Sequence, residues 1–223
     1  MKDMNIPYYA QTAEFTCGPA CVLMIFKHFD PGLKLNLSLE FEVWRQCNMI
    51  GVRGADPFGI SVPLLAAGCD AHLVTRYKRT INLDLWKKRL RQHSFTPEDA
   101  SLAAFAVAEN RKRALDRGLS VEYGRITVER IAASVAEGFI PVALVHMGVV
   151  HQYDIPHWVV VTDVGADHVA FNDPYPPKGG KGIRVSRDEF QKMLDDIGTR
   201  IGMSPSVLFV AGARCALGGC DEV

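Results

Sequence analysis

The sequence predicts an α+β fold in a single domain, and three observations lead to that prediction. Segments with the apolar spacing of helices fill most of the first half of the chain, whereas segments typical of β-strands dominate after residue 138. No internal repeat, low-complexity block or long linker interrupts the 223 residues. A chain of this length buries one sizeable core without disulfide staples. We therefore expect N-terminal helices packed on a C-terminal antiparallel sheet, with 1–223 forming one domain.

The expected helices begin near capping residues and several end at glycine. Thr16 and Ser38 stand where the N-caps of the first two helices are expected, and Ser186 with Glu189 forms the pattern of a capping box. Gly118 follows the longest helical segment in the position where glycine commonly ends a helix. These signals predict helices over 17–29, 38–47, 60–67, 97–117, 127–138 and 186–196.

The expected strands are short apolar runs bounded by turn residues. One of them lies in the first half of the chain, and the others follow in the second half with a glycine-containing turn at 165–167 between two of them. The runs are 71–77, 140–146, 157–164, 168–172 and 206–211.

Composition excludes several classes of partner and of site. Lys+Arg and Asp+Glu are equal at 25 each, which argues against nucleic acid or an anionic membrane surface as a partner. The chain has no apolar run near the ~20 residues that span a bilayer, and its first residues lack the apolar region of a signal peptide. We therefore expect a cytoplasmic protein whose six cysteines are thiols. No metal or organic cofactor is expected.

Cys17 is the first candidate for chemistry, because it begins a buried helix in the sequence Cys-Gly-Pro-Ala. A thiol at a helix N-terminus lies in the positive end of the helix dipole, which favours the nucleophilic thiolate. Backbone N–H groups of the first turn can face a developing oxyanion, and the Gln11 amide is a second donor six residues upstream. By itself, however, a cysteine in an apolar helix is more often a packing residue.

A predicted hairpin supplies the partners that such a nucleophile needs. If the turn between 157–164 and 168–172 centres on Gly165, His157 lies directly opposite Asp173. The carboxylate can then orient the imidazole, and the imidazole can take the thiol proton. A slip of one residue would move Asp173 to the other face and leave Asn172 as the orienting residue.

Several other features have simpler interpretations. Cys21 stands one helical turn after Cys17 and is more often a core residue than a resolving thiol, although a redox function stays open. The irregular spacing of His146, His151 and His157 does not favour a metal site. Residues 148–156 instead resemble a flap beside the active site, and 178–182 and the tail 217–220 are expected to be flexible.

The set Gln11, Cys17-Gly-Pro-Ala, His157-Trp-Val-Val-Val and Asp173-Pro resembles the double-glycine leader peptidases, papain-like cysteine peptidases that process bacteriocin precursors. The resemblance covers about two thirds of the chain. It implies a papain-like fold, with Gln11 as oxyanion donor, Cys17 as nucleophile, His157 as base and Asp173 as its orienter. This chain carries neither an ABC exporter's ATPase nor membrane spans, so it is more similar to stand-alone bacterial forms, and residues 78–126 are longer than the family's corresponding region.

The sequence therefore predicts a cysteine peptidase or amidase that acts on a peptide or protein substrate, possibly at a glycine-containing bond, through a thioester. Acyl transfer to an amine and a non-catalytic peptide-binding module are the alternatives. We also expect Gly18, Trp158, His151 and Tyr153 to contact the substrate. The sequence does not predict an oligomeric state.

Overall fold

A seven-stranded sheet forms the middle of the molecule in the computed structural model, which describes residues 4–79, 81–82, 85, 88, 95–151 and 155–212. Its strand order is β2-β1-β7-β3-β4-β5-β6, with antiparallel pairs throughout except for the parallel pair of β1 and β2. The elements are α1 (Cys17–Phe29), α2 (Leu37–Cys47), α3 (Pro57–Ala66), β1 (Cys69–Thr75), α5 (Pro97–Asp116), β2 (Ser120–Tyr123), α6 (Val128–Ala136), β3 (Ile140–His146), β4 (Pro156–Val164), β5 (His168–Asp173), β6 (Gly180–Ser186), α7 (Arg187–Asp196), the π-helical turn η1 (Ile197–Ile201) and β7 (Ser206–Gly212).

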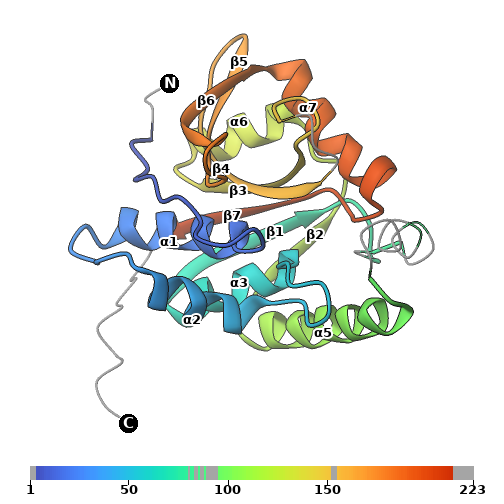
Figure 1. The fold of residues 1–223 in the computed structure, drawn as a ribbon. Coiled ribbons are helices and arrows are strands. Elements are labelled where there is room, and N and C mark those ends of the chain that lie inside the picture. Colours follow the sequence, from blue (N-terminus) through green and yellow to red (C-terminus); the bar gives the residue numbers. More distant parts are fainter. Residues whose placement is uncertain are drawn as a thin grey trace.

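Helices cover both faces of this sheet (Figure 1). Helices α1, α2, α3 and α5 lie on one side, and α6 and α7 lie on the other. The strands alternate between two apolar cores: Leu144 and Trp158 pack with the N-terminal helices, whereas Val145 and Val159 pack with α6 and α7. The predicted α+β class, with N-terminal helices on a largely antiparallel sheet, is confirmed.

The helix caps were predicted correctly in the second half of the chain and less well in the first. Ser186 and Glu189 form the expected capping box, and the Thr127 hydroxyl caps α6. The prediction that Ser38 caps α2 is wrong, because Asn36 accepts a hydrogen bond from the Leu39 N–H at 2.9 Å. Helix α3 begins earlier than expected, where the Asp56 carboxylate accepts from the N–H groups of the first turn.

The start of α1 also differs from the prediction, with a consequence for the site. The Thr16 hydroxyl does not cap the helix but donates to the Ala13 carbonyl at 2.9 Å. The N-cap side chain therefore leaves the N–H groups of the first turn of α1 to other acceptors.

Two strands were missed by the sequence analysis, and both lie at edges of the sheet. The segment predicted as a flexible loop at 178–182 enters β6, which pairs with β5 and is polar and largely exposed. Strand β2 has only four residues and pairs with β1. Edge strands with polar side chains give no apolar alternation, so pattern alone does not reveal them.

Residues 78–126 supply α5 and β2, and α5 packs against α3. Their status as a family-atypical insertion stays a prediction. The tail 217–220 lies outside the described residues. None of the described helices is long and apolar enough to cross a membrane.

Candidate active site

Cys17 lies at the first position of α1 and is partly exposed, unlike the fully buried residues that follow it. Burial raises the pKa of its thiol, whereas the positive charge and the hydrogen bond of His157 lower it. The backbone N–H groups of Trp158 and Gly18 also donate to the sulfur, and the net pKa of Cys17 is below its ordinary value. The sulfur therefore accepts a hydrogen bond in the first turn of α1, and this bond favours the thiolate form of Cys17.

The hairpin of β4 and β5 brings His157 and Asp173 together by a register that the sequence did not predict. The Gly165 N–H donates to the His168 carbonyl at 2.9 Å, so Ala166 and Asp167 form the tip of the turn. Val164 pairs with Val169 next to the turn, but Val161 pairs with Phe171 further along. Thr162 is the extra residue of a β-bulge between these pairs.

The bulge decides which face of the sheet carries Asp173. Continued from Val161 and Phe171, the register sets Asp173 opposite Val159, so His157 and Asp173 are diagonal neighbours on one face. The expectation that they are directly opposite is wrong by two residues. Without the extra residue the pairing next to the turn would continue, and Asp173 would lie on the other face from His157.

Asp173 is fully buried and accepts hydrogen bonds at both oxygens. His157 Nε2 donates to Oδ1 at 2.7 Å, and the Tyr175 N–H donates to the same atom at 2.9 Å. His151 Nε2 lies 2.5 Å from Oδ2. Burial raises the pKa of Asp173, but the hydrogen bond and charge of His157, with the bonds from Tyr175 and His151, together outweigh it. The pKa is therefore below its ordinary value, and the group is a carboxylate.

His157 connects the carboxylate to the thiol. Because Nε2 faces Asp173, Nδ1 is the ring nitrogen left for the hydrogen bond to Cys17. Burial lowers the pKa of His157, but the Cys17 charge and then the Asp173 carboxylate raise it to about 9. A lowered thiol pKa and a raised imidazole pKa together favour a thiolate–imidazolium pair at neutral pH.

Gln11 lies beside this group. Its backbone N–H donates to the Pro174 carbonyl at 2.9 Å, next to Asp173, and its side-chain Nε2 donates to the Ala13 carbonyl at 2.7 Å. The side chain is buried and its Oε1 has no partner among the described residues. One hydrogen of the amide remains for another acceptor.

A buried glutamate on α2 fixes the segment that carries Gln11. The Glu40 side chain accepts from the Tyr9 hydroxyl at 2.9 Å, the Thr12 N–H at 2.9 Å and the Thr12 hydroxyl at 2.7 Å. These residues flank Gln11, so Glu40 holds the chain on both sides of it. Glu40 could not be singled out from the sequence, because it resembles any polar residue of a surface helix.

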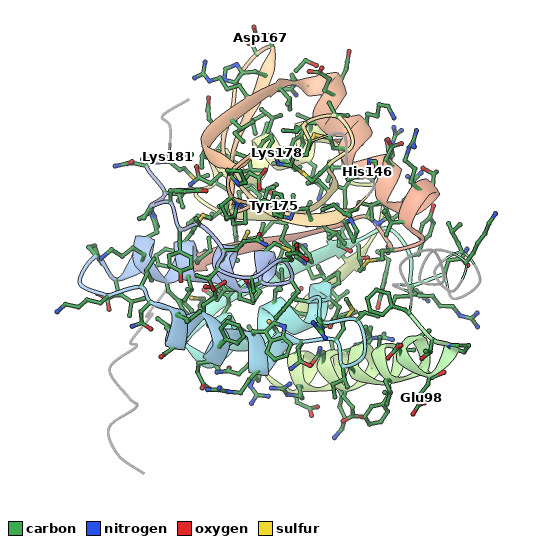
Figure 2. The ribbon with its side chains drawn as sticks, viewed as in Figure 1. Glu98, His146, Asp167, Tyr175, Lys178 and Lys181 are labelled. Carbon is green, nitrogen blue, oxygen red and sulfur yellow. The ribbon has the colours of Figure 1, made fainter. Side chains whose placement is uncertain are left out.

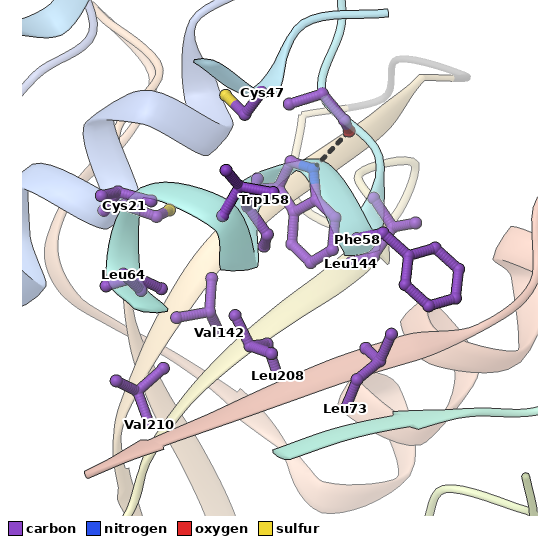
Figure 3. Close-up of a cluster of buried hydrophobic side chains, with 14 of the residues drawn as sticks. Cys21, Cys47, Phe58, Leu64, Leu73, Val142, Leu144, Trp158, Leu208 and Val210 are labelled. Carbon is purple, nitrogen blue, oxygen red and sulfur yellow. Dashed lines mark hydrogen bonds between the residues drawn. The ribbon is translucent and has the colours of Figure 1, made fainter. Parts of the chain in front are cut away.

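The residues expected to contact substrate lie in different surroundings. The Trp158 side chain is 1% exposed, and its ring nitrogen donates to the Ala55 carbonyl at 2.9 Å inside the apolar core (Figure 3). The Trp158 side chain thus faces the core side of β4, and its contact with substrate stays a prediction. Gly18 is also buried, and a Cβ there would lie 3.0 Å from Ala55 Cβ. Tyr153 lies outside the described residues.

His151 is not free for substrate, because it bonds Asp173 and is 5% exposed. Tyr175, missed by the sequence analysis, packs with both histidines: its ring centroid lies 6.0 Å from that of His157 and 5.9 Å from that of His151. Tyr175 is half-buried, and Figure 2 labels it near the middle of the view. Its position two residues after Asp173 was the one signal that could have indicated it.

The alternatives left open by the sequence can be compared with this geometry. Asn172 lies on the opposite face from His157 and donates to the Ile6 carbonyl at 3.3 Å, so it does not orient the histidine. Cys21 is fully buried, and burial raises the pKa of its thiol well above the ordinary value. In the part of the chain that the structure describes, no group of three His, Cys, Asp or Glu residues is arranged to hold a metal ion.

Comparison with known proteins adds a family. A family profile described as "Peptidase_C39 like family" matches residues 6–196. Comparison with curated proteins gave no significant match.

Three solved structures are similar to the chain at low sequence identity. The peptidase domain of Streptococcus ComA, a bi-functional ABC transporter, is 14% identical with a TM-score of 0.47, covering 94% of this chain and 100% of that one. A double glycine motif protease from an AMS/PCAT transporter, solved with its leader peptide, is 12% identical with a TM-score of 0.47, covering 94% of each chain. A C39-like peptidase from Bacillus anthracis is 10% identical with a TM-score of 0.45, covering 94% of this chain and 96% of that one. At these values the similarities carry no weight for activity.

Proposed function

The chain belongs to the Peptidase_C39 like family, and from this membership and the geometry of the site we propose that it is a cysteine peptidase that acts through a Cys17 thioester. The observation that carries the proposal is the continuous line of hydrogen bonds from Cys17 through His157 to Asp173. Nucleophile, base and orienting carboxylate come from α1, β4 and the end of β5. A protein that only packed a cysteine in its core would not need the charged pair beside it.

The reaction follows from the protonation states of the site. The Cys17 thiolate attacks the carbonyl carbon of the peptide bond, and the carbonyl electron pair moves to the oxygen. As the C–N bond breaks, the His157 imidazolium gives its Nδ1 proton to the leaving amine, and a thioester remains. Water then gives a proton to His157 and attacks the thioester, the C–S bond breaks, and the acid product leaves. The Asp173 carboxylate keeps Nδ1 facing the sulfur throughout.

Two kinds of donor support the oxyanion in this proposal. The N-cap side chain of α1 makes no bond to the first turn, and the Gly18 N–H of that turn donates to the Cys17 sulfur, so backbone donors lie beside the reacting atom. The Gln11 amide, buried and fixed by Glu40 through its neighbours, has one hydrogen left after its bond to Ala13. Removing one such donor from an enzyme typically costs about 100-fold in kcat or more.

The substrate in this proposal is a peptide with a glycine-containing cleavage site. This choice follows from the sequence resemblance to the double-glycine leader peptidases that Gln11, Cys17, His157 and Asp173 carry. No metal or organic cofactor takes part, since nucleophile, base and oxyanion donors all come from the chain itself. Transfer of the acyl group to an amine would use the same thioester, and the test below separates it from hydrolysis.

The test is peptide-library cleavage in water enriched in ¹⁸O, analysed by mass spectrometry. Hydrolysis through the thioester puts one ¹⁸O atom into each new carboxyl group, whereas transfer to an amine adds none. We expect cleavage by the native protein and none by Cys17→Ala, with Cys69→Ala as the control for a buried thiol on β1. Equal cleavage by the native protein and by Cys17→Ala would contradict the proposal, and so would the absence of any cleavage or transfer product.

A further inference from the structure

Asp173 bonds two histidines, and the proposed reaction uses only one of them. His157 connects the carboxylate to Cys17, whereas His151 approaches the other carboxylate oxygen and has no step in the reaction. His151 is nevertheless as buried as His157, with 5% and 3% of their surfaces exposed. A buried imidazole on a catalytic carboxylate needs a reason for being there.

His151 is held in place by its own loop. This residue ends a turn after β3, in which the Val150 and His151 N–H groups donate to the Met147 carbonyl at 3.1 and 2.8 Å. The Tyr175 ring packs against it from the far end of β5. The imidazole therefore reaches Asp173 from a fixed backbone, and its Nε2 lies 2.5 Å from Oδ2.

The two carboxylate oxygens of Asp173 accept hydrogen bonds from different partners. Oδ1 accepts from both His157 Nε2 and the Tyr175 N–H, so its bonds fix the direction of the catalytic imidazole. Among the described residues, Oδ2 has His151 as its hydrogen-bond partner, and a buried carboxylate oxygen without a donor is costly. The charge on Asp173 favours the Nε2–H tautomer of His151 as donor.

We propose that His151 is a positioning residue: by holding Oδ2, it fixes the carboxylate plane of Asp173 so that Oδ1 stays directed at His157. The proposal rests on the proposed peptidase function. His151 is not a second base, because only His157 has a hydrogen bond to Cys17. Among the described residues of the loop between β3 and β4, His151 is bonded to the catalytic carboxylate.

Two substitutions of similar size test the proposal. His151→Gln keeps a donor, because a glutamine amide nitrogen reaches about as far as the imidazole Nε2, and His151→Met keeps the volume without a donor. His146→Ala is the matched control: His146 is equally buried at the start of the same loop, but it lies toward α7, 3.8 Å from Asp196, and apart from Tyr175 in Figure 2. Steady-state kinetics and the rate of Cys17 alkylation by iodoacetamide are measured for each.

We expect His151→Met to lower kcat about tenfold or more with KM changed less than about twofold, since it removes a hydrogen bond to a charged group. The Cys17 alkylation rate at pH 6 should fall in parallel. His151→Gln should recover most of the native kcat and of the native alkylation rate. The control, His146→Ala, should match the native protein in both. If circular dichroism shows that His151→Met does not fold, His151→Asn, which is polar but too short to reach Oδ2, replaces it.

Three results would overturn the proposal. If the donor-free variant has the native kcat and the native Cys17 alkylation rate, a hydrogen bond to Asp173 Oδ2 is not required for activity. A raised KM with unchanged kcat assigns His151 to substrate binding. Equal losses in the Gln variant and the donor-free variant show that the donor is not what matters. Failure of the peptidase function is a separate result, in which Cys17 of the native protein is no more reactive than the other thiols.

Discussion

Two aspartates of this protein are both fully buried, and their surroundings have opposite effects on them. Asp173 ends β5 between two histidines, and its pKa is lowered by His157 despite burial. Asp56 caps α3 on the other side of the sheet, where burial raises its pKa to about 6 even though Asn110 and two backbone N–H groups donate to it. The pKa of one carboxylate is therefore lowered, and the pKa of the other is raised to about 6.

The difference shows that partners, and not burial, decide what a buried carboxylate can do. Neutral donors bond the oxygens of Asp56 but offset only part of the desolvation that raises its pKa. The bond from Asn110 joins α3 to α5, which is a structural function. The imidazolium of His157 compensates the charge of Asp173, which in turn raises the pKa of His157 to about 9. The same residue type thus has a structural function in one region and a proposed catalytic function in the other.

The largest effect is expected from Asp173→Asn. An amide has one acceptor oxygen, so it can keep that oxygen toward only one of the two histidines, and the negative charge is lost. We expect kcat/KM for peptide cleavage to fall on the order of 1000-fold, by analogy with the loss of the orienting carboxylate in other triads. The alkaline limit of activity should also move below about 9, because the pKa of His157 falls without its counter-charge.

The same exchange in the other region, Asp56→Asn, is the matched control for that prediction. It should leave kcat/KM within about twofold, since Asp56 lies outside the Cys17, His157 and Asp173 group. A loss of activity as large as that of Asp173→Asn would mean that the two carboxylates do not differ in function.

Asp56→Asn should instead change how stability depends on pH, with a smaller effect. Because the folded-state pKa of Asp56 is raised to about 6, its contribution to stability is fully present below the unfolded pKa and is lost as pH rises through about 6. The shift of roughly two units corresponds to about 3 kcal/mol. The free energy of unfolding of the native protein, relative to the variant, should therefore fall by about that amount between pH 4 and 7 in urea titrations. Parallel curves for the two proteins would contradict the charge state assigned to Asp56.

Much of the fold and part of the site could be predicted from the sequence. Apolar spacing and caps located most helices and the central strands, and the positions of Cys17 and His157 on a helix start and a strand followed from them. The predicted hairpin paired His157 with Asp173, although in a register wrong by two residues, and the family resemblance implied their functions. The family itself is confirmed. The catalytic functions of these residues remain proposals.

What could not be predicted depends on contacts between distant segments. The bulge at Thr162 sets the register of β4 on β5, and nothing in the local sequence distinguishes that threonine from its neighbours. His151 joins Asp173 only because the loop after β3 folds back across the end of β5. Glu40 likewise bonds Tyr9 and Thr12 only because the fold places α2 beside the segment that contains Gln11.

The central claim is that His157 and Asp173 make Cys17 a thiolate nucleophile. The most direct measurement is the alkylation rate of each cysteine by iodoacetamide at pH 6, followed by peptide mapping, in the native protein and in His157→Ala. We predict that Cys17 reacts at least about tenfold faster than the other five thiols, because its pKa is lowered by His157, and that the substitution removes this advantage. Uniform alkylation of all six cysteines, or a Cys17 rate unchanged in His157→Ala, would contradict the account.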